Sequence, residues 1–560
     1  MKELQKQEKK LALLVLLIML VALVPLYMVA DYAHPSVDDY SYGKLTAEAW
    51  EQTGSFGSVL ATAWERTAYT YETHQGTFVS VFLMRLQPGI FGEDYYFLTT
   101  VFLLSTFLVC SILFYYAFFN RIFGADRTKS WLIAAVLSLG AMEFTHVVSD
   151  SFYWYNGGVT YTFFYSMEVL LFTLLIYMYT TKKKIVKGLL CFVCMLLAVV
   201  ACGGNYVTSL VTLELLVFIC AVTGLVEYKK VQQKKQKKEQ NTETFLRKNG
   251  IINLWFCLLV LLAAAVTFLF VVAAPGNALR QEKTGDANNP IIAILLSFVY
   301  GAYSLGNCMD LPALLLLFLC VPIFVVIAGN VCKRGRFAFP CPLLVTFFSF
   351  CLYSSQVTPV FYAQGIKLPY RIMNIIYFSC FVMVALNLFY WIGYLNAKHT
   401  ISHVQICKVL KKDGERYVSD EAKKTKTYSC ILQTVENWHT KHFWKFYAVA
   451  ALLFCFSVAG NISIAAEVDV EGAAQVEVSE LPATLSACYF LLNGDAKVFD
   501  KECKERYTVY SNPDIKDVVV EPFTVTPDII FHSDITEDPD NWKNKCIKKY
   551  FNKHSVRLAK

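Results

Sequence analysis

Long apolar runs alternate with short polar connections along most of this 560-residue chain. Each run approaches the roughly twenty residues that a helix needs to cross the hydrocarbon core of a bilayer. The pattern therefore predicts an all-α polytopic membrane bundle of about eleven transmembrane helices. The expected spans lie near residues 11–30, 95–119, 131–149, 159–180, 188–203, 207–226, 251–274, 309–331, 337–358, 371–396 and 446–465.

One apolar stretch, residues 291–308, does not fit this alternation. It is apolar enough to span, but a further crossing would move the basic loop 333–336 to the opposite side of the membrane. We therefore expect a helix that lies in the outer interface or re-enters the membrane. An even-numbered topology remains open if the segment crosses.

The charged connections set the expected orientation. Lys9 and Lys10 precede the first run, and basic residues concentrate in 182–184, 227–240, 333–336 and 397–445. By the positive-inside rule these segments are cytoplasmic, which predicts a multi-pass plasma-membrane protein with a cytoplasmic N-terminus and an extracytoplasmic C-terminus. The first run has no small-residue cleavage site after it, which favours an uncleaved span. Because the basic residues sit in these segments beside membrane lipids, the net charge of +7 indicates no nucleic-acid partner.

Two segments are expected outside the membrane. The first outer loop, 31–94, has nine acidic and three basic residues, and its apolar residues recur at the spacing of amphipathic helices. The tail, 466–560, mixes short β-branched runs such as VDVEGAAQVEV with helical stretches such as DAKVFDKECKERY. We expect a transmembrane bundle over 1–465 and a small extracytoplasmic α+β C-terminal domain over 466–560.

Most of the eighteen cysteines fall inside apolar runs, where cysteine behaves as a small hydrophobic residue. Cys191 and Cys194 have CxxC spacing, but they open a span and lack a second pair. The sequence therefore predicts no metal site there.

Two adjacent carboxylates follow the first span. Asp38 and Asp39 lie in AHPSVDDYSYG, without a basic neighbour. One interpretation is that an aspartate caps the next helix. The other is that one of them acts as a general base, or binds a divalent cation, for a substrate at the membrane surface. The two interpretations are compatible.

Further polar and aromatic residues are expected on the same outer face. Carboxylates inside spans normally face a bundle interior or a watery cavity, although single cases often make only interhelical hydrogen bonds. Aromatic rings with amides suit a sugar, but they also form interfacial aromatic belts. The candidate substrate-binding residues are His74, Glu143, Trp154, Asn156, Asn205 and Glu214, with His146 and Glu168 as further polar residues of the outer halves.

Basic residues in two outer loops are candidates for binding phosphate. Arg280 lies in APGNALRQ, whereas Lys367 and Arg371 lie in KLPYRIMN. A guanidinium presents a planar fork of donors that matches phosphate oxygens. The alternative is that an arginine at the end of a span extends to lipid head groups.

The motifs DDYSYG, HQGTF, WYNGG, GGNYVTS, APGNxxR, LPYRIMN and DITEDPDNWKN occur in this order. In this the chain resembles a family of multi-spanning bacterial membrane proteins, which is in turn similar to GT-C-type glycosyltransferases. That resemblance implies a polyprenyl-phosphate sugar donor used on the outer face. An acidic residue of the first outer loop, here Asp38 or Asp39, would activate the acceptor or bind a metal. The phosphate would contact Arg371 or Arg280.

The chain lacks the separated acidic pair of many metal-dependent members. The resemblance therefore favours a metal-free base mechanism and leaves a divalent cation open as a cofactor. The sequence as a whole predicts an inverting membrane glycosyltransferase that modifies a cell-envelope glycan or a lipid-linked saccharide. The alternatives are a transporter or flippase of a lipid-linked glycan, which also needs an inward-facing pathway, and an anchored envelope interaction protein.

Overall fold

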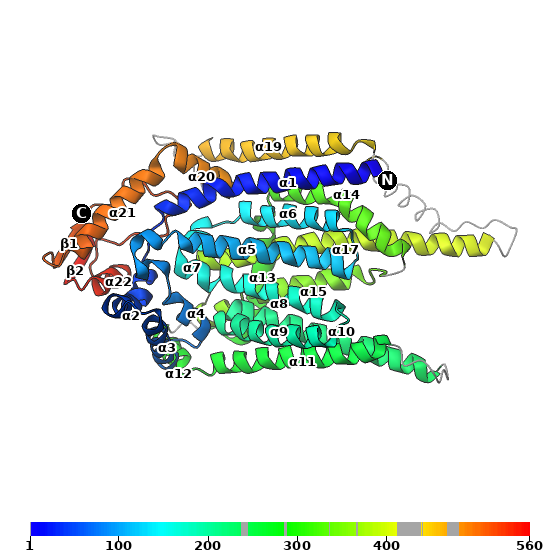
Figure 1. Ribbon diagram of the computed structural model, residues 1–560, viewed down its shortest axis with the longest axis horizontal. Coiled ribbons are helices and arrows are strands. Elements are labelled where there is room, and N and C mark those ends of the chain that lie inside the picture. The colour runs from blue at the N-terminus through cyan, green and yellow to red at the C-terminus, as the bar shows by residue number, and fades with distance from the viewer. Residues whose placement is uncertain are drawn as a thin grey trace.

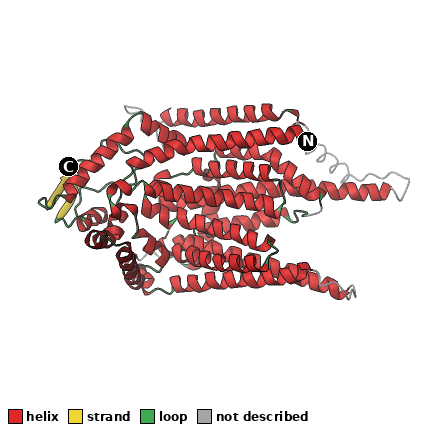
Figure 2. Cartoon of the chain, in the orientation of Figure 1, coloured by secondary structure: helices red, strands yellow, loops and turns green. Residues whose placement is uncertain are grey.

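The computed structural model describes residues 2–236, 245–284, 288–334, 337–365, 368–410, 438, 441–467 and 481–559. These residues form a bundle of long helices with a cap of shorter elements at one end (Figures 1 and 2). The long helices are α1 (Lys2–Val29), α5 (Leu98–Ala117), α6 (Arg127–Glu143), α8 (Thr162–Thr180), α9 (Lys184–Gly204), α10 (Tyr206–Gln236), α11 (Phe245–Val272), α13 (Pro290–Cys308), α14 (Leu311–Lys333), α15 (Pro342–Ser355), α17 (Tyr370–Leu410) and α19 (Phe443–Glu467).

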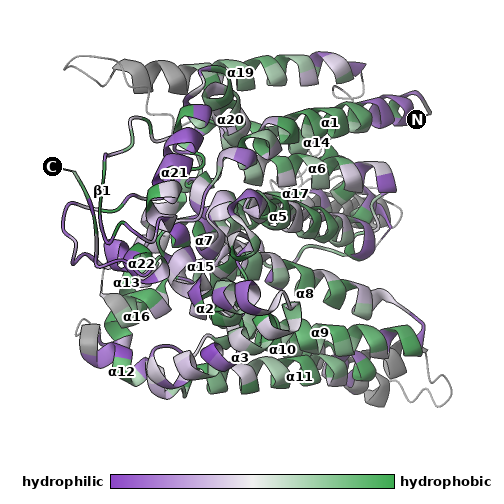
Figure 3. Ribbon diagram, turned by 60° about the vertical axis from the view of Figure 1, so that its left-hand side comes forward, coloured by the Kyte–Doolittle hydropathy of each residue, from purple (hydrophilic) through white to green (hydrophobic). Residues whose placement is uncertain are grey.

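Within the described residues, ten helical stretches are long and apolar enough to cross a membrane. Figure 3 shows that the middles of the bundle helices are hydrophobic and that hydrophilic residues concentrate toward the two ends. The chain is thus an all-α multi-pass membrane protein. Each expected span falls on a helix, but two of these helices, α6 with 17 residues and α19, are not among those ten stretches. Helix α6 packs between α1, α5 and α14.

Helix α13 corrects the expectation for 291–308. It is one of the ten stretches that are long and apolar enough to cross a membrane, and one face of it packs against α15 and α16 (Thr358–Gln364) while the other is exposed. Along α13, Asn288 just before the helix bonds to the Tyr362 carbonyl, Ser297 bonds to Thr358, and Ser304 bonds to Tyr353. Helix α13 therefore runs away from the cap.

Helix α14 continues in the same direction. Near its start, Leu316 lies beside Gly140 together with Phe381 of α17. Near its end, Cys332 donates to the Gly393 carbonyl, which lies twelve residues further along α17. Between the two helices the Asp310 side chain caps α14 by accepting from the Ala313 amide at 2.9 Å. Because α13 and α14 point the same way, the two helices together count as one crossing. The loops that follow α14 therefore stay on the sides of the membrane that are expected without a further crossing.

One end of the bundle, which we call the cap end, carries the segments outside the long helices (Figure 1). The N-terminus lies at the other end. The cap-end elements before the tail are η1 (Ala30–Tyr32), α2 (Asp38–Thr53), α3 (Phe56–Thr73), α4 (Phe78–Met84), η2 (Pro88–Phe91), η3 (Glu93–Tyr95), η5 (Ser149–Tyr153), α7 (Tyr155–Thr160) and α12 (Pro275–Thr284). A further short element, η4 (Phe118–Ile122), follows α5 at the opposite end of the bundle.

Helix α3 has the amphipathic character that its sequence predicts. Val59 and Ala63 are fully buried one turn apart, whereas Trp64 is 63% exposed and Tyr69 is 56% exposed. Exposed aromatic rings of this kind suit the boundary between lipid and water.

The tail folds onto the cap end. It contains α20 (Ala483–Leu492), α21 (Asp495–Ser511), β1 (Asp517–Val520), α22 (Trp542–Tyr550) and β2 (Ser555–Leu558). The two strands pair in parallel, with Asp517 opposite Ser555 (Figure 2). The Tyr40 ring of α2 packs into this tail at 5.0 Å from the Tyr550 ring. That the tail forms a domain of its own stays a prediction. The strand expected at 468–478 lies outside the described residues.

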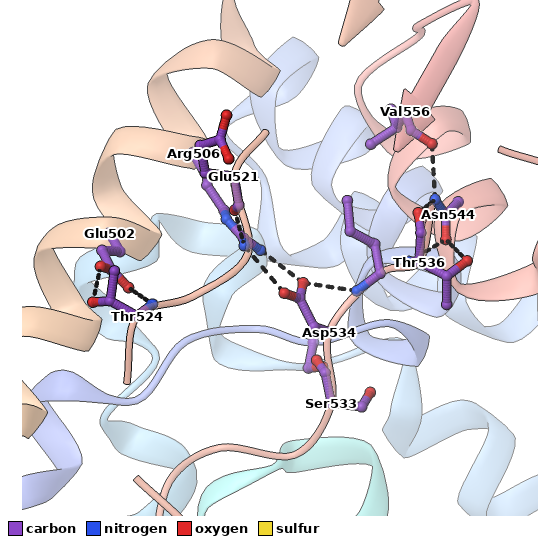
Figure 4. A network of polar contacts seen from close by, with 11 residues as sticks. Glu502, Arg506, Glu521, Thr524, Ser533, Asp534, Thr536, Asn544 and Val556 are labelled. Atoms are coloured by element: carbon purple, nitrogen blue, oxygen red, sulfur yellow. Dashed lines mark hydrogen bonds and ion pairs between the residues drawn. The ribbon is translucent and has the colours of Figure 1, made fainter. Parts of the chain in front are cut away.

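Polar contacts fix the loop that follows β1. Arg506 of α21 donates to both carboxylate oxygens of Asp534, at 2.7 and 3.1 Å (Figure 4). Asn544 of α22 donates to the carbonyls of Thr536 and Val556 (Figure 4). Charge-assisted paired bonds of this kind position a loop with little freedom. They hold the stretch that contains His532.

A histidine links the tail to the first loop. His34 lies between two carboxylates, 2.6 Å from Glu93 and 2.9 Å from Asp500 of α21. Burial opposes the charged imidazole, but the hydrogen bonds to Asp500 and Glu93 outweigh it and raise the pKa of His34. The pKa of Asp500 is lowered, because its contacts with His34 and Lys504 outweigh burial.

These pKa shifts predict a pH-dependent attachment of α21. The His34 contribution to stability is fully present below its unfolded pKa, about 6.5, and is lost as pH rises through the higher folded pKa. The Asp500 contribution is present above about pH 3.9 and is lost as pH falls through its lowered folded pKa. Hydrogen exchange of the α21 amides, corrected for intrinsic rates, should therefore accelerate between pH 6 and pH 9. A His34→Gln variant should lack this dependence, and an equal dependence in the variant would contradict the assignment.

Candidate functional site

The structure separates the roles of the two adjacent aspartates. Asp39 is completely buried. One carboxylate oxygen accepts from the Tyr96 hydroxyl at 2.6 Å and from the Ser36 amide at 3.0 Å, and the other accepts from the Asn156 amide at 3.1 Å. Asp39 therefore joins α2 to the segments that begin α5 and α7.

The capping interpretation is corrected in detail. The N-cap position of α2 is Val37, which makes no side-chain capping bond. Asp39 instead reaches back to the amide of Ser36, before the helix. Burial raises the pKa of Asp39 to about 7, against the three hydrogen bonds that favour its charged form. We assign Asp39 a structural role rather than the catalytic one expected for either aspartate.

Replacing Asp39 with asparagine is expected to destabilise the cap end. In asparagine, one carboxylate oxygen becomes an NH₂ group, and it would face N–H or O–H groups that donate to the carboxylate of Asp39. A hydrogen bond to a buried group that is lost in this way costs about 1–3 kcal/mol. The melting temperature of the purified protein should therefore fall. Asp38→Asn is the matched control on the same helix and should melt like the wild type. Equal melting of both variants would contradict the structural role.

Asp38 is only partly buried, and its side chain makes no hydrogen bond with another residue of the described parts of the chain. Burial raises the pKa of Asp38, while the positive charges of Arg371, His532 and Arg280 act in the opposite direction. Three basic groups from α17, the tail and α12 thus lie near this one carboxylate. We call Asp38, Asp150, Trp154, Arg280, Arg371 and His532 the Asp38 cluster.

Arg371, at the start of α17, lies beside two aromatic rings. Its guanidinium carbon is 5.6 Å from the centre of the Trp154 ring and 5.8 Å from that of Tyr161. A guanidinium beside aromatic faces keeps its charge and its planar donors. Arg280 is held by a different element, because its guanidinium donates to the side-chain oxygen Oε1 of Gln75 at 2.7 Å. Both arginines act electrostatically on Asp38, and their assignment to phosphate stays a prediction.

Two residues of the cluster were missed from the sequence. The His532 Nδ1 lies 2.7 Å from the Asp150 carboxylate, and its ring stacks on Trp154 with ring centres 3.5 Å apart. Asp150 is 6% exposed. The pair is separated by 382 positions in the chain, so no local pattern joins it. The sequence signal was only that both residues adjoin motifs of the family resemblance, WYNGG and DITEDPDNWKN.

Unpartnered polar atoms concentrate next to this pair. Among the described residues, neither polar atom of the Asn156 side-chain amide has a hydrogen-bond partner, although Asn156 is only 2% exposed. The Trp154 indole nitrogen and the Ser151 and Thr160 hydroxyls are likewise buried without a partner in this part of the chain. Because buried polar groups are normally paired, these atoms are available to water or to a ligand.

Three other predicted substrate-binding residues are used elsewhere, which corrects that assignment. Glu143 accepts from the Thr484 amide at 3.0 Å and thereby holds the start of α20. Glu214 accepts from the Ser355 hydroxyl at 2.6 Å, between α10 and α15. Asn205 caps α10 through the Thr208 amide and donates to the Thr160 carbonyl.

The interhelical interpretation of the span carboxylates is therefore the correct one for Glu143 and Glu214, and Glu168 likewise accepts from Thr212. His74 is exposed at the end of α3, and its backbone lies against Gly276 of α12. Lys367 lies outside the described residues.

Within the parts of the chain that the structure describes, no group of three or more His, Cys, Asp or Glu side chains is placed to hold a metal ion. Cys191 and Cys194, which have CxxC spacing, are buried in α9.

No protein-family model matches the chain, and no curated protein matches it. The resemblance to GT-C-type glycosyltransferases therefore stays a prediction.

Proposed function

We propose that this protein is a membrane glycosyltransferase that takes a sugar from a polyprenyl-phosphate donor at the outer face of the plasma membrane. The observation that carries the proposal is the meeting of Asp38, Arg371 and Arg280 at the cap end. They come from α2, α17 and α12, and they combine one carboxylate with two phosphate-binding donors. The N-terminus would be cytoplasmic and the cap extracytoplasmic, in keeping with the basic loops at the N-terminal end.

In the proposed reaction, Asp38 removes the proton from an acceptor hydroxyl. The hydroxyl oxygen then bonds to the anomeric carbon of the donor sugar, and the bond from that carbon to the phosphate oxygen breaks. The leaving polyprenyl phosphate keeps the electron pair, and Arg371 and Arg280 stabilise its charge. The acceptor would be a cell-envelope glycan or a lipid-linked saccharide.

The buried polar atoms beside the cluster suit the sugar part of the donor. The Asn156 amide offers two donors and an acceptor, and the Trp154 indole offers a donor, all without a partner in the described protein. Sugar hydroxyls both donate and accept. Filling these positions would remove the cost of burying unpaired polar groups.

The two arginines are assigned the role that a divalent cation has in metal-dependent enzymes of this kind. A planar guanidinium binds phosphate oxygens in pairs and carries a permanent charge. A divalent cation stays an open prediction, and adding a chelator to the assay tests it. Activity that survives the chelator supports the two-arginine assignment.

The test is a transfer assay with the full-length protein in liposomes. Radiolabelled polyprenyl-phosphate hexoses are supplied together with lipid-linked saccharides as acceptors. We expect labelled sugar to pass to an acceptor while polyprenyl phosphate accumulates. If the labelled donor instead crosses the bilayer without cleavage, the flippase alternative replaces the proposal.

A further inference from the structure

We propose that Arg85 and Tyr42 form a second anion site, which binds a phosphate group of the acceptor beside the Asp38 cluster. The inference rests on the proposed function and deepens it, because it names the acceptor as a phosphate-bearing saccharide. Arg85 follows α4 in the stretch VFLMRLQPG, and Tyr42 lies on α2. We call these two side chains the Arg85 site.

Arg85 is a buried cation surrounded by neutral groups. The residue is only 8% exposed. Its Nη2 donates to the Arg66 carbonyl at 3.1 Å and to the Thr70 hydroxyl at 2.7 Å, both on α3. Arg85 pairs with no carboxylate in the part of the chain that the structure describes. Because buried charges in proteins are normally paired, an anion from outside the chain is expected to complete this site.

The Arg85 site also has hydrogen-bond donors to spare. The Nε of Arg85 is buried and has no partner among the described residues, and its Nη1 makes no hydrogen bond to them either. The Tyr42 ring lies against the guanidinium, with its centre 5.3 Å from the guanidinium carbon. The Tyr42 hydroxyl likewise makes no hydrogen bond to another described residue. Two neighbouring side chains therefore both offer donors to a ligand.

Helix α2 places the Arg85 site next to Asp38. Tyr42 follows Asp38 by four residues, so both lie on one face of the helix, about 6 Å apart along its axis. Thr46 lies one turn further along the same face, and its hydroxyl donates to the Arg85 carbonyl at 2.7 Å. This bond ties Arg85 to α2. An acceptor that presents a hydroxyl to Asp38 and lies along α2 would bring its next group to Arg85.

The donors of the Arg85 site suit a phosphate better than a carboxylate. They come from two nitrogens and a hydroxyl, and the tetrahedral oxygens of a phosphate can accept from several directions at once. The donor phosphate is already assigned to Arg371 and Arg280, so a second phosphate belongs to the acceptor. Lipid-linked saccharides carry such a group as a diphosphate, and many cell-envelope glycans carry it as a phosphodiester.

The test measures binding and needs no transfer. The full-length protein in detergent is titrated with three probes: a disaccharide linked to polyprenyl diphosphate, the same disaccharide linked to glycerol by a phosphodiester, and the disaccharide alone. We expect one or both phosphorylated probes to bind at least about tenfold more tightly than the disaccharide alone. The phosphorylated probe that binds more tightly identifies the source of the phosphate. Equal binding of all three probes would overturn the proposal.

Two variants assign the binding to the Arg85 site. Arg85→Gln should weaken binding of the phosphorylated probe by roughly 10- to 100-fold, the usual loss for a hydrogen bond to a charged group. Tyr42→Phe should weaken it by about tenfold. Tyr42→Phe keeps the ring and should melt like the wild type, so it carries the test even if Arg85→Gln folds poorly. Wild-type binding in Tyr42→Phe together with a lowered melting temperature in Arg85→Gln would make Arg85 structural and overturn the site.

The matched control for Tyr42→Phe is Tyr69→Phe. Tyr69 also lies under a guanidinium, with its ring centre 4.9 Å from the guanidinium carbon of Arg66, but it is 56% exposed on α3. Tyr69→Phe should bind all three probes as the wild type does. An equal loss in Tyr69→Phe and Tyr42→Phe would show that the effect does not come from the Arg85 site.

Arg371→Gln separates this inference from the proposed function. We expect Arg371→Gln to lose binding of polyprenyl phosphate but to keep that of the glycerol-linked probe, and Arg85→Gln to show the reverse. If this pattern is found but no sugar is transferred, the anion site stands and the glycosyltransferase proposal is wrong. If sugar is transferred, but Arg85→Gln uses phosphorylated acceptors with the wild-type KM, the anion site is wrong and the glycosyltransferase proposal stands.

Discussion

Replacing Asp38 with asparagine is expected to lower the rate of sugar transfer by roughly 10²- to 10⁴-fold, the usual contribution of a general base. The fold should be unaffected, because Asp38 makes no hydrogen bond with another residue in the described parts of the chain. Initial rates in proteoliposomes and the melting temperature in detergent measure the two effects separately. The expected combination is a large loss of rate with an unchanged melting temperature.

The matched control for Asp38→Asn is Glu48→Gln. Glu48 also lies on α2, where it pairs with Lys44 of the same helix, with 3.6 Å between the charged atoms. Surface pairs of this kind contribute little to stability, so both the rate and the melting temperature should stay at wild-type values. Wild-type transfer in Asp38→Asn would show that Asp38 is not the base.

Replacing Arg371 with glutamine is expected to lower transfer by roughly 10²- to 10³-fold, the usual effect of removing one group that stabilises developing charge. Binding of polyprenyl phosphate itself should also weaken, because the phosphate loses a charged, planar donor. The two measurements are the initial rate and a titration of the protein with polyprenyl phosphate in detergent. A lysine at the same position should recover only part of the binding, since it lacks the fork of donors.

The chain provides a closely matched control for Arg371. Arg121 also lies over an aromatic ring, with its guanidinium carbon 4.9 Å from the centre of Tyr177, but at the end of the bundle away from the cap. Arg121→Gln should leave transfer and phosphate binding unchanged. If Arg371→Gln binds polyprenyl phosphate as tightly as the wild type does, the phosphate lies elsewhere and the proposed geometry is wrong.

Much of the bundle was predictable because the bilayer imposes a length and a composition on each crossing. The boundary between α13 and α14 was also predictable, because Asp310 is followed by Leu311 and Pro312, a capping residue and a proline that begin a new helix. The common direction of the two helices was not, since an apolar stretch does not show how its helix is oriented relative to the next one.

The residue types of the site were predictable, but their partners were not. Asp38 and Asp39 are adjacent and chemically identical, and only the fold places Asp39 against Tyr96 and Asn156. The pair of Asp150 and His532 forms because the tail folds back over the bundle, which no spacing in the sequence indicates. Glu143 and Glu214 were assigned to substrate because a buried carboxylate has the same sequence signature whether it binds a ligand or a neighbouring helix.

The most direct test of the central claim is to map where a photoreactive donor attaches. A polyprenyl-phosphate sugar with a diazirine on the sugar ring is bound to the full-length protein and irradiated, and the labelled peptides are identified by mass spectrometry. The account predicts labels on peptides that contain Asp38, Trp154 or His532, and weaker labelling in Arg371→Gln. Labelling confined to the end of the bundle away from the cap, or unchanged in Arg371→Gln, would contradict it.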